Sequence, residues 1–173
     1  MSYMTYKPVG FILVLNLLVL LPLLGGCAKP SVSINRIEYK TAGYGSASKL
    51  GTAVVRSARS QIGKPYKWGG SSPEEGFDCS GLVWWAYRVH GVKLPRVSWQ
   101  QVKSGRPVRK EDCKAGDVVF FRIPGQAKSL HAGIYTGAGR RFIHSPKSGH
   151  SVREESMDKS YWQKYFIGAR RFF

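Results

Sequence analysis

The stretch Phe77-Asp78-Cys79-Ser80-Gly81 leads directly into apolar residues at positions 82, 83, 86 and 89. This spacing covers one face of an α-helix, so the sequence predicts a helix that begins at or near Cys79 and ends at Gly91. A cysteine at a helix start lies where backbone N–H groups and the helix dipole stabilise an anion. Cys79 is therefore a candidate nucleophile, and we expect its thiol pKa to be lowered.

Other segments flank this helix. Apolar residues at helical spacing, followed by Gly63 and Pro65 as a stop, predict a first helix over residues 50–62. Breaker residues predict a loop over 66–73, and a short amphipathic piece is expected at 98–103.

Beyond residue 116 the hydrophobic pattern becomes typical of strands. Short β-branched and aromatic runs at 118–123, 132–136 and 141–144 predict an antiparallel meander. A helical turn at 161–165 and a last strand at 166–173 are expected after it. Helices followed by strands indicate an α+β domain, with the N-terminal helices packed on an antiparallel sheet.

Two histidines fall at strand ends in this scheme. His131 opens one strand and His144 ends the next, so an antiparallel hairpin would set their rings side by side. A nucleophilic cysteine needs a base within hydrogen-bond reach and a third group that orients the base. The sequence therefore offers Cys79, His131 and His144 as a catalytic set.

Composition narrows the choice of partner. The chain has 173 residues, and its 27 Lys+Arg against 10 Asp+Glu give a formal charge of +17. This length suits one domain, and the charge favours an anionic partner such as nucleic acid, anionic lipid or a cell-wall polymer. Three Cys and four His show no CxxC or HExxH pattern, so no metal site and no cofactor are expected.

The amino terminus has the form of a secretory signal peptide over residues 1–26. Its apolar run, 11–24, is shorter than the roughly 20 residues that span a bilayer. The ending Leu24-Gly25-Gly26-Cys27 resembles the lipobox of bacterial lipoproteins, which implies lipidation of Cys27. We expect a lipidated tether at 27–49, a domain at 50–173 and, with Ala28 after the cysteine, an outer-membrane anchor facing the periplasm, where nucleic acid is not a partner.

The order of the motifs resembles the NlpC-type cell-wall endopeptidases of the papain-like superfamily. The segments that carry this resemblance are Tyr66-Lys67-Trp68-Gly69-Gly70, Asp78-Cys79-Ser80-Gly81-Leu82-Val83, Ala115-Gly116-Asp117-Val118-Val119-Phe120-Phe121, His131-Ala132-Gly133-Ile134-Tyr135 and Phe142-Ile143-His144-Ser145. The resemblance implies a papain-like fold and hydrolysis of peptidoglycan stem peptides, commonly at the D-γ-glutamyl–meso-diaminopimelate bond.

The resemblance also implies roles for single residues. Cys79 corresponds to the nucleophile, His131 to the general base and acid, and His144 to the polar residue that orients His131. Tyr66 corresponds to a tyrosine near the thiolate that assists the oxyanion site, and the nearby Trp68 is expected to contact substrate.

Three further positions are expected at the substrate. Asp78 and Ser80 match positions that line the substrate site, and Arg96 could meet a substrate carboxylate with its planar fork. We expect a monomer. Two alternatives stay open: a non-catalytic wall-binding lipoprotein on the same fold, and an amidase or acyltransferase that uses the same Cys–His pair.

Overall fold

The computed structural model describes residues 47–124 and 130–173. The expected signal peptide, Cys27 and nearly all of the expected tether lie outside the described residues. Within the described part of the chain, no helix is long and apolar enough to cross a membrane.

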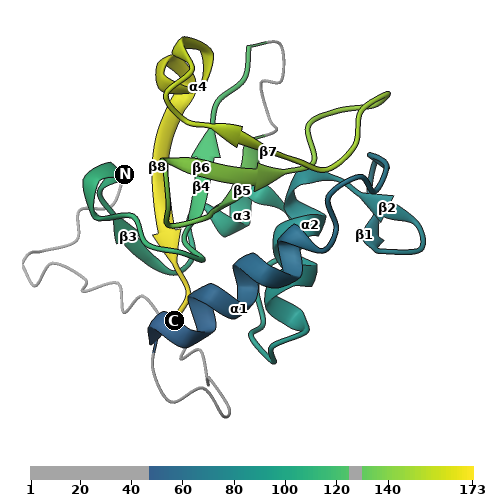
Figure 1. Ribbon diagram of the computed structural model, residues 1–173, viewed down its shortest axis with the longest axis horizontal. Helices are drawn as coiled ribbons and strands as arrows, with labels where there is room; N and C mark the ends of the chain where they lie inside the picture. The colour runs from purple at the N-terminus through teal and green to yellow at the C-terminus, as the bar shows by residue number, and fades with distance from the viewer. Residues whose placement is uncertain (1–46, 125–129) are drawn as a thin grey trace, which may run out of the picture. The chain divides into compact units, whose positions relative to one another are not determined.

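The helices come mainly before the strands, as expected for an α+β domain (Figure 1). The helical elements are α1 (Ala47–Arg59), α2 (Cys79–Arg88), α3 (Ser98–Gln101), the 3₁₀ turn η1 (Lys110–Asp112) and α4 (Ser160–Tyr165). The strands are β1 (Ser71–Ser72), β2 (Gly76–Phe77), β3 (Arg106–Val108), β4 (Val118–Phe121), β5 (His131–Tyr135), β6 (Arg141–His144), β7 (Arg153–Ser156) and β8 (Phe166–Arg171).

The main sheet is antiparallel, with the strand order β3-β8-β4-β5-β6-β7. Strands β4 to β6 form the predicted meander, and β7 extends it by one strand. The last strand does not extend it but returns to pair with β4 on its other side, between β4 and β3. Strands β3, β7 and the small β1–β2 pair were not predicted, because each has at most four residues and shows no alternating apolar pattern.

Both faces of the sheet are covered. Along β4 the side chains alternate: Val118 and Phe120 join the core under α1 and α2, whereas Val119 and Phe121 join a second core that includes Trp162 of α4. Alternation with a period of two is the geometry of a strand, so one apolar run serves two cores. The sheet therefore has α1 and α2 on one face and the short helix α4 on the other.

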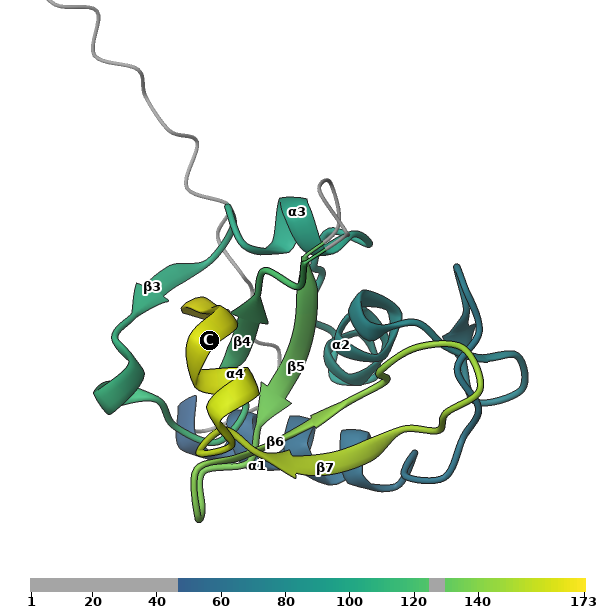
Figure 2. The ribbon, with the colours of Figure 1, turned by 90° about the horizontal axis from the view of Figure 1, so that it is seen from above.

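Helix α1 begins at Ala47, before the predicted start at 50, and ends at Arg59 rather than 62, where turns follow. Gly63 has a φ of 92°, a left-handed conformation that does not continue an α-helix. Its N–H donates to the Val152 carbonyl at 2.9 Å instead of to a carbonyl of the helix. Helix α2 starts at Cys79 as predicted, and it ends at Arg88, short of Gly91. Figure 2 shows α2 alongside β5, which brings the helix start to the sheet.

Candidate active site

Asp78 fixes the start of α2 and with it the position of Cys79. Its backbone is extended (φ −85°, ψ 173°), and its carboxylate accepts the Gly81 N–H at 2.6 Å. This is an aspartate N-cap, which satisfies a backbone donor that the helix leaves unpaired. Cys79 is thus the first residue of the helix and keeps part of its surface exposed.

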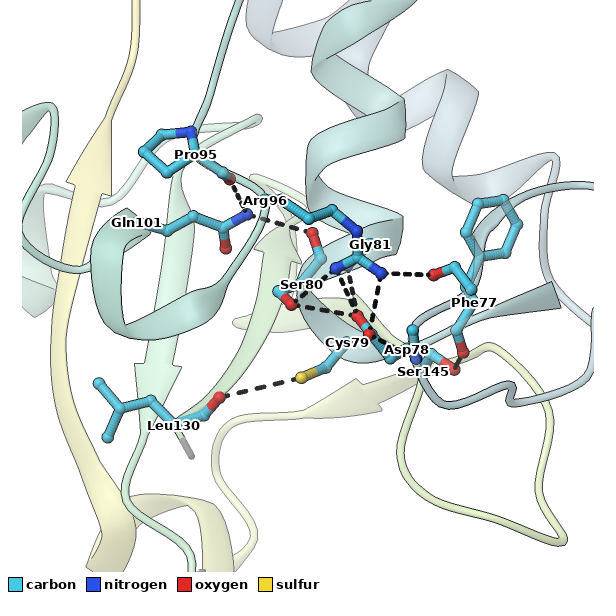
Figure 3. Close-up of polar contacts among 12 residues, drawn as sticks. Phe77, Asp78, Cys79, Ser80, Gly81, Pro95, Arg96, Gln101, Leu130 and Ser145 are labelled. Atoms are coloured by element: carbon cyan, nitrogen blue, oxygen red, sulfur yellow. Dashed lines mark hydrogen bonds and ion pairs between the residues drawn. The ribbon is translucent and has the colours of Figure 1, made fainter. Parts of the chain in front are cut away.

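The same carboxylate organises a polar network beside the cysteine (Figure 3). Arg96 donates to both oxygens of Asp78, at 3.0 and 2.9 Å, and Ser80 donates to one of them at 3.0 Å. The guanidinium also donates to the Ser80 hydroxyl at 3.2 Å and to the Gly70 carbonyl at 3.0 Å. Asp78, Ser80 and Arg96, three of the expected substrate residues, therefore lie together. The guanidinium of Arg96 pairs with Asp78, and the Arg96 side chain is 29 % exposed to solvent.

The two histidines lie side by side at the open end of the β5–β6 hairpin, as their strand positions predict. His131 Nε2 and His144 Nδ1 are 2.7 Å apart, and both residues are buried. This hydrogen bond occupies Nε2 of His131 and leaves its Nδ1 for another partner. An imidazole oriented in this way has a free nitrogen with which to accept a proton.

The thiol of Cys79 lies against the strand that carries His131. Its Sγ is 3.9 Å from the Leu130 carbonyl oxygen, the contact drawn in Figure 3. Leu130 precedes His131, and the backbone of Ala132, which follows it, also hydrogen-bonds the sulfur. Contacts on both sides of His131 therefore tie the start of α2 to the start of β5.

Burial keeps the Cys79 thiol neutral in the resting protein. It raises the pKa of the Cys79 thiol to about 11, which outweighs the lowering by backbone hydrogen bonds from Ala132 and Ser80. The expectation of a lowered thiol pKa is therefore wrong for the resting protein: the helix start favours the thiolate, but the surrounding protein disfavours it more. Burial, followed by the charge of His144, holds the pKa of His131 well below its usual 6.5.

The loop before β1 contributes two aromatic residues. Tyr66 forms an isolated parallel bridge with Phe77, two residues before Cys79. Burial raises the pKa of Tyr66, and the neighbouring charges of Cys79 and Asp78 add to this effect. Trp68 is 79 % exposed. Its ring is free for contact with a large ligand, whereas Tyr66 is held close to the cysteine.

The sequence reasoning missed two residues that contact the histidines. Glu155 of β7 has a carboxylate oxygen 3.7 Å from His144 Nε2, and its other oxygen accepts the Trp162 indole N–H at 2.6 Å. Trp162 of α4 stacks on His131, with ring centroids 5.5 Å apart and planes 23° apart. Neither residue belongs to a motif, and no local signal in the sequence identifies them.

Ser145 joins the hairpin to the cysteine segment. Its buried hydroxyl donates to the carbonyl of Phe77 at 2.6 Å, directly before Asp78 (Figure 3). Ser145 belongs to the Phe142-Ile143-His144-Ser145 motif, but no role was predicted for it. Across residues 47–124 and 130–173, no group of three or more potential ligands is arranged to hold a metal ion.

Comparison with known proteins identifies the family that these features represent. Residues 63–171 match the model of the NlpC/P60 family. This chain belongs to the NlpC/P60 family. The match spans the cysteine, both histidines and the network around Asp78, and it confirms the expected family and the α+β, papain-like fold.

Similar proteins of known name and a solved structure support the same family. The chain is 39 % identical over 146 residues to murein DD-endopeptidase MepH of Escherichia coli K12, covering 78 % of this chain and 54 % of MepH. It is 39 % identical over 119 residues to the bifunctional muramidase/DL-endopeptidase CwlT of Bacillus subtilis, covering 68 % of this chain and 35 % of CwlT.

An NlpC/P60 family protein from Bacillus cereus superposes with a TM-score of 0.65 at 33 % identity, over 75 % of this chain and 43 % of that protein. The chain thus spans about half or less of the length of these relatives.

Proposed function

We propose that this protein is a cysteine endopeptidase that hydrolyses peptide bonds in peptidoglycan. The observation that carries the proposal is the arrangement of Cys79 at the start of α2 against the strand whose first residue, His131, is hydrogen-bonded to His144 at 2.7 Å. The names of MepH and CwlT, both endopeptidases, support the same class of reaction.

The chemistry follows from the resting protonation. Cys79 is neutral and His131 is an unprotonated base, so the thiol proton passes to His131 Nδ1 as the sulfur attacks the scissile carbonyl. The carbonyl oxyanion forms beside the backbone N–H of Cys79, with the Tyr66 hydroxyl as a second donor. His131 then gives its proton to the leaving amine as the C–N bond breaks, and an acyl-enzyme remains. Water, deprotonated by His131, hydrolyses the thioester and restores the thiol.

For the bond cleaved, we propose the D-γ-glutamyl–meso-diaminopimelate bond of the stem peptide. The name of CwlT, a DL-endopeptidase, supports this choice. The name of MepH, a DD-endopeptidase, favours a second candidate, the D,D-crosslink between stem peptides. Cleavage of either bond would use the same thiol and the same steps. The two candidates are therefore distinguished by the fragments that the protein releases.

We further propose that Cys27 carries a lipid that anchors the protein in the bacterial envelope, facing the periplasm. The Leu24-Gly25-Gly26-Cys27 ending supports this proposal, and the charge of +17 suits an anionic wall or lipid surface. Labelling of cells with a radioactive fatty acid tests it: the wild-type chain should take up label and Cys27→Ser should not. Equal labelling of the two would refute the anchor.

The activity test uses purified muropeptides and the full chain in detergent. Mass spectrometry should detect fragments ending in D-glutamate and beginning with diaminopimelate for the wild type and for Cys113→Ala, and none for Cys79→Ala. Cys113→Ala is the matched control because Cys113 is the other free thiol in the described residues. Cleaved crosslinks instead would select the D,D bond. No products from any variant would favour a wall-binding protein.

A further inference from the structure

The inner nitrogen of His144 faces an anion that the catalytic scheme does not use. His144 is fully buried, and its Nε2 makes no hydrogen bond within the described residues. A buried imidazole nitrogen without a partner is costly, so the group nearest to it matters. The carboxylate Oε1 of Glu155 lies 3.7 Å from this nitrogen, and the Glu155 side chain is 11 % exposed.

Glu155 is itself held in place by other groups. Its Oε2 accepts the Trp162 indole N–H at 2.6 Å, and its Oε1 accepts from Arg153 Nε, also at 2.6 Å. Lys159 lies 3.5 Å from Oε2. The charged and titratable groups around the histidine pair are therefore Glu155, Arg153 and Lys159. One anion faces the inner nitrogen, and two cations lie on the solvent side of that anion.

The carboxylate determines which nitrogens carry protons. An ionised carboxylate only accepts, so His144 Nε2 facing it carries the proton. Neutral His144 then has an unprotonated Nδ1, which accepts from His131 Nε2–H across the 2.7 Å contact. Neutral His131, protonated on Nε2, has a free lone pair on Nδ1. This is the tautomer that can take the proton of Cys79.

A second contact runs through Trp162. Its indole stacks on His131 and lies edge-on to His144, with ring centroids 5.2 Å apart for the second pair. The N–H of the same indole donates to Glu155. One carboxylate therefore faces His144 and also holds the ring that stacks on His131.

We propose that Glu155 is a positioning residue of this active site: it selects the Nε2–H tautomer of His144 and, through it, the tautomer in which His131 can accept the thiol proton. This inference rests on the proposed function only for its effect on hydrolysis. Its effect on the histidines and on the reactivity of Cys79 is independent of any substrate.

The decisive variant is Glu155→Gln, because an amide has one acceptor and one donor. The Trp162 indole N–H, which is partly buried, keeps the amide oxygen at the Oε2 position. The NH₂ group then takes the Oε1 position, where it faces His144 and opposes a proton on Nε2, while the exposed Arg153 turns to solvent. The hydrogen bonds then reverse along the pair, and both histidines become protonated on Nδ1. Glu154→Gln is the matched control: it is the next residue of β7, and it pairs with Arg59 and Arg141 instead of the histidines.

Nitrogen-15 NMR of the full chain in detergent reads the tautomers directly. We expect Nε2–H for His131 and His144 in the wild type and in Glu154→Gln, and Nδ1–H in Glu155→Gln. The rate of alkylation of Cys79 by iodoacetamide, followed by peptide mass spectrometry, measures how well His131 accepts the thiol proton. Between about pH 7 and 8 the neutral histidine should keep this rate nearly constant, and Glu155→Gln should lower it at least about 10-fold.

Hydrolysis of muropeptides should fall further, by about 100-fold or more in kcat, as in catalytic triads whose histidine is held in the wrong tautomer. Wild-type tautomers and alkylation in a folded Glu155→Gln protein would overturn the inference, whatever its activity. Where Glu155→Gln does not fold, Glu155→Ala replaces it: mixed tautomers would support the inference and unchanged ones would overturn it. If the wild type cleaves nothing but the tautomers shift, the proposed function fails and the inference stands.

Discussion

Replacement of Asp78 tests how strongly the start of α2 depends on one carboxylate. The N-cap bond to Gly81 contributes about 1 kcal/mol. The charge-assisted bonds to Arg96 add about 2 kcal/mol, a value reduced because the Arg96 side chain is 29 % exposed and partly screened by solvent. Asp78→Ala should therefore lower the free energy of unfolding by about 3 kcal/mol, which corresponds to a fall in melting temperature of about 10 °C.

Asp78→Asn separates the two contributions. Asparagine caps helices about as well as aspartate, so this variant keeps the bond to the Gly81 N–H and loses the charge that faces Arg96. It should cost about 2 kcal/mol, and the difference from Asp78→Ala should be the capping energy. Urea denaturation at pH 7, followed by tryptophan fluorescence, measures both.

A double-mutant cycle with Arg96→Gln completes the test. If the contacts at 2.9 and 3.0 Å act as a unit, the double variant Asp78→Asn/Arg96→Gln should show a coupling energy of about 2 kcal/mol. Equal effects of Asp78→Asn and Asp78→Ala would refute the role of the cap. Additive effects within about 0.5 kcal/mol would refute the ion pair. Asp112→Asn, in the exposed pair with Arg109, is the control and should leave stability nearly unchanged.

Three further changes should have measurable effects. Gly81→Ala places a Cβ 2.1 Å from the Gly70 carbonyl oxygen, so urea denaturation should show a loss of about 2 kcal/mol despite the helix propensity of alanine, and a gain would contradict the packing. Because the pKa of His131 lies below 6.5, unfolded chains bind protons before folded ones do; stability should fall as the pH drops below 6.5, and His131→Gln should flatten this slope in thermal melts. Asp117→Asn leaves the buried Arg171 without its carboxylate, at 2.6 Å in the native protein, and should cost about 3–5 kcal/mol; a cost below 1 would mean that Arg171 reaches solvent.

What could be predicted from the sequence is what depends on neighbours along the chain. The start of α2 at Cys79 follows from the apolar series at helical spacing that comes after it, and the adjacent histidine rings follow from strand ends in a hairpin. Each signal extends over a few residues, and each was confirmed. The ends of α1 and α2 were misplaced because turns and glycines at positive φ compete with the helical pattern there.

What the sequence did not reveal depends on contacts between distant segments. The raised pKa of Cys79 comes from burial, which no helix rule contains. The Asp78–Arg96 pair joins residues 18 apart, and either side chain alone is compatible with a ligand-facing role. Glu155 lies in a polar strand that shows no alternation, and its partners, His144 and Trp162, come from β6 and α4.

The candidate site lies where three parts of the fold meet: the start of α2, the β5–β6 hairpin, and the β7–α4 segment. The buried Ser145 hydroxyl joins the hairpin to the segment before α2 through the Phe77 carbonyl. Glu155 of β7 faces His144 of the hairpin and holds Trp162 of α4. A lost joining bond shifts one piece against another while each core persists, because the two cores lie on opposite faces of the sheet. Geometry at the thiol therefore depends on a few contacts that contribute little to the whole fold, and substitutions at these contacts should reduce reactivity before they reduce stability.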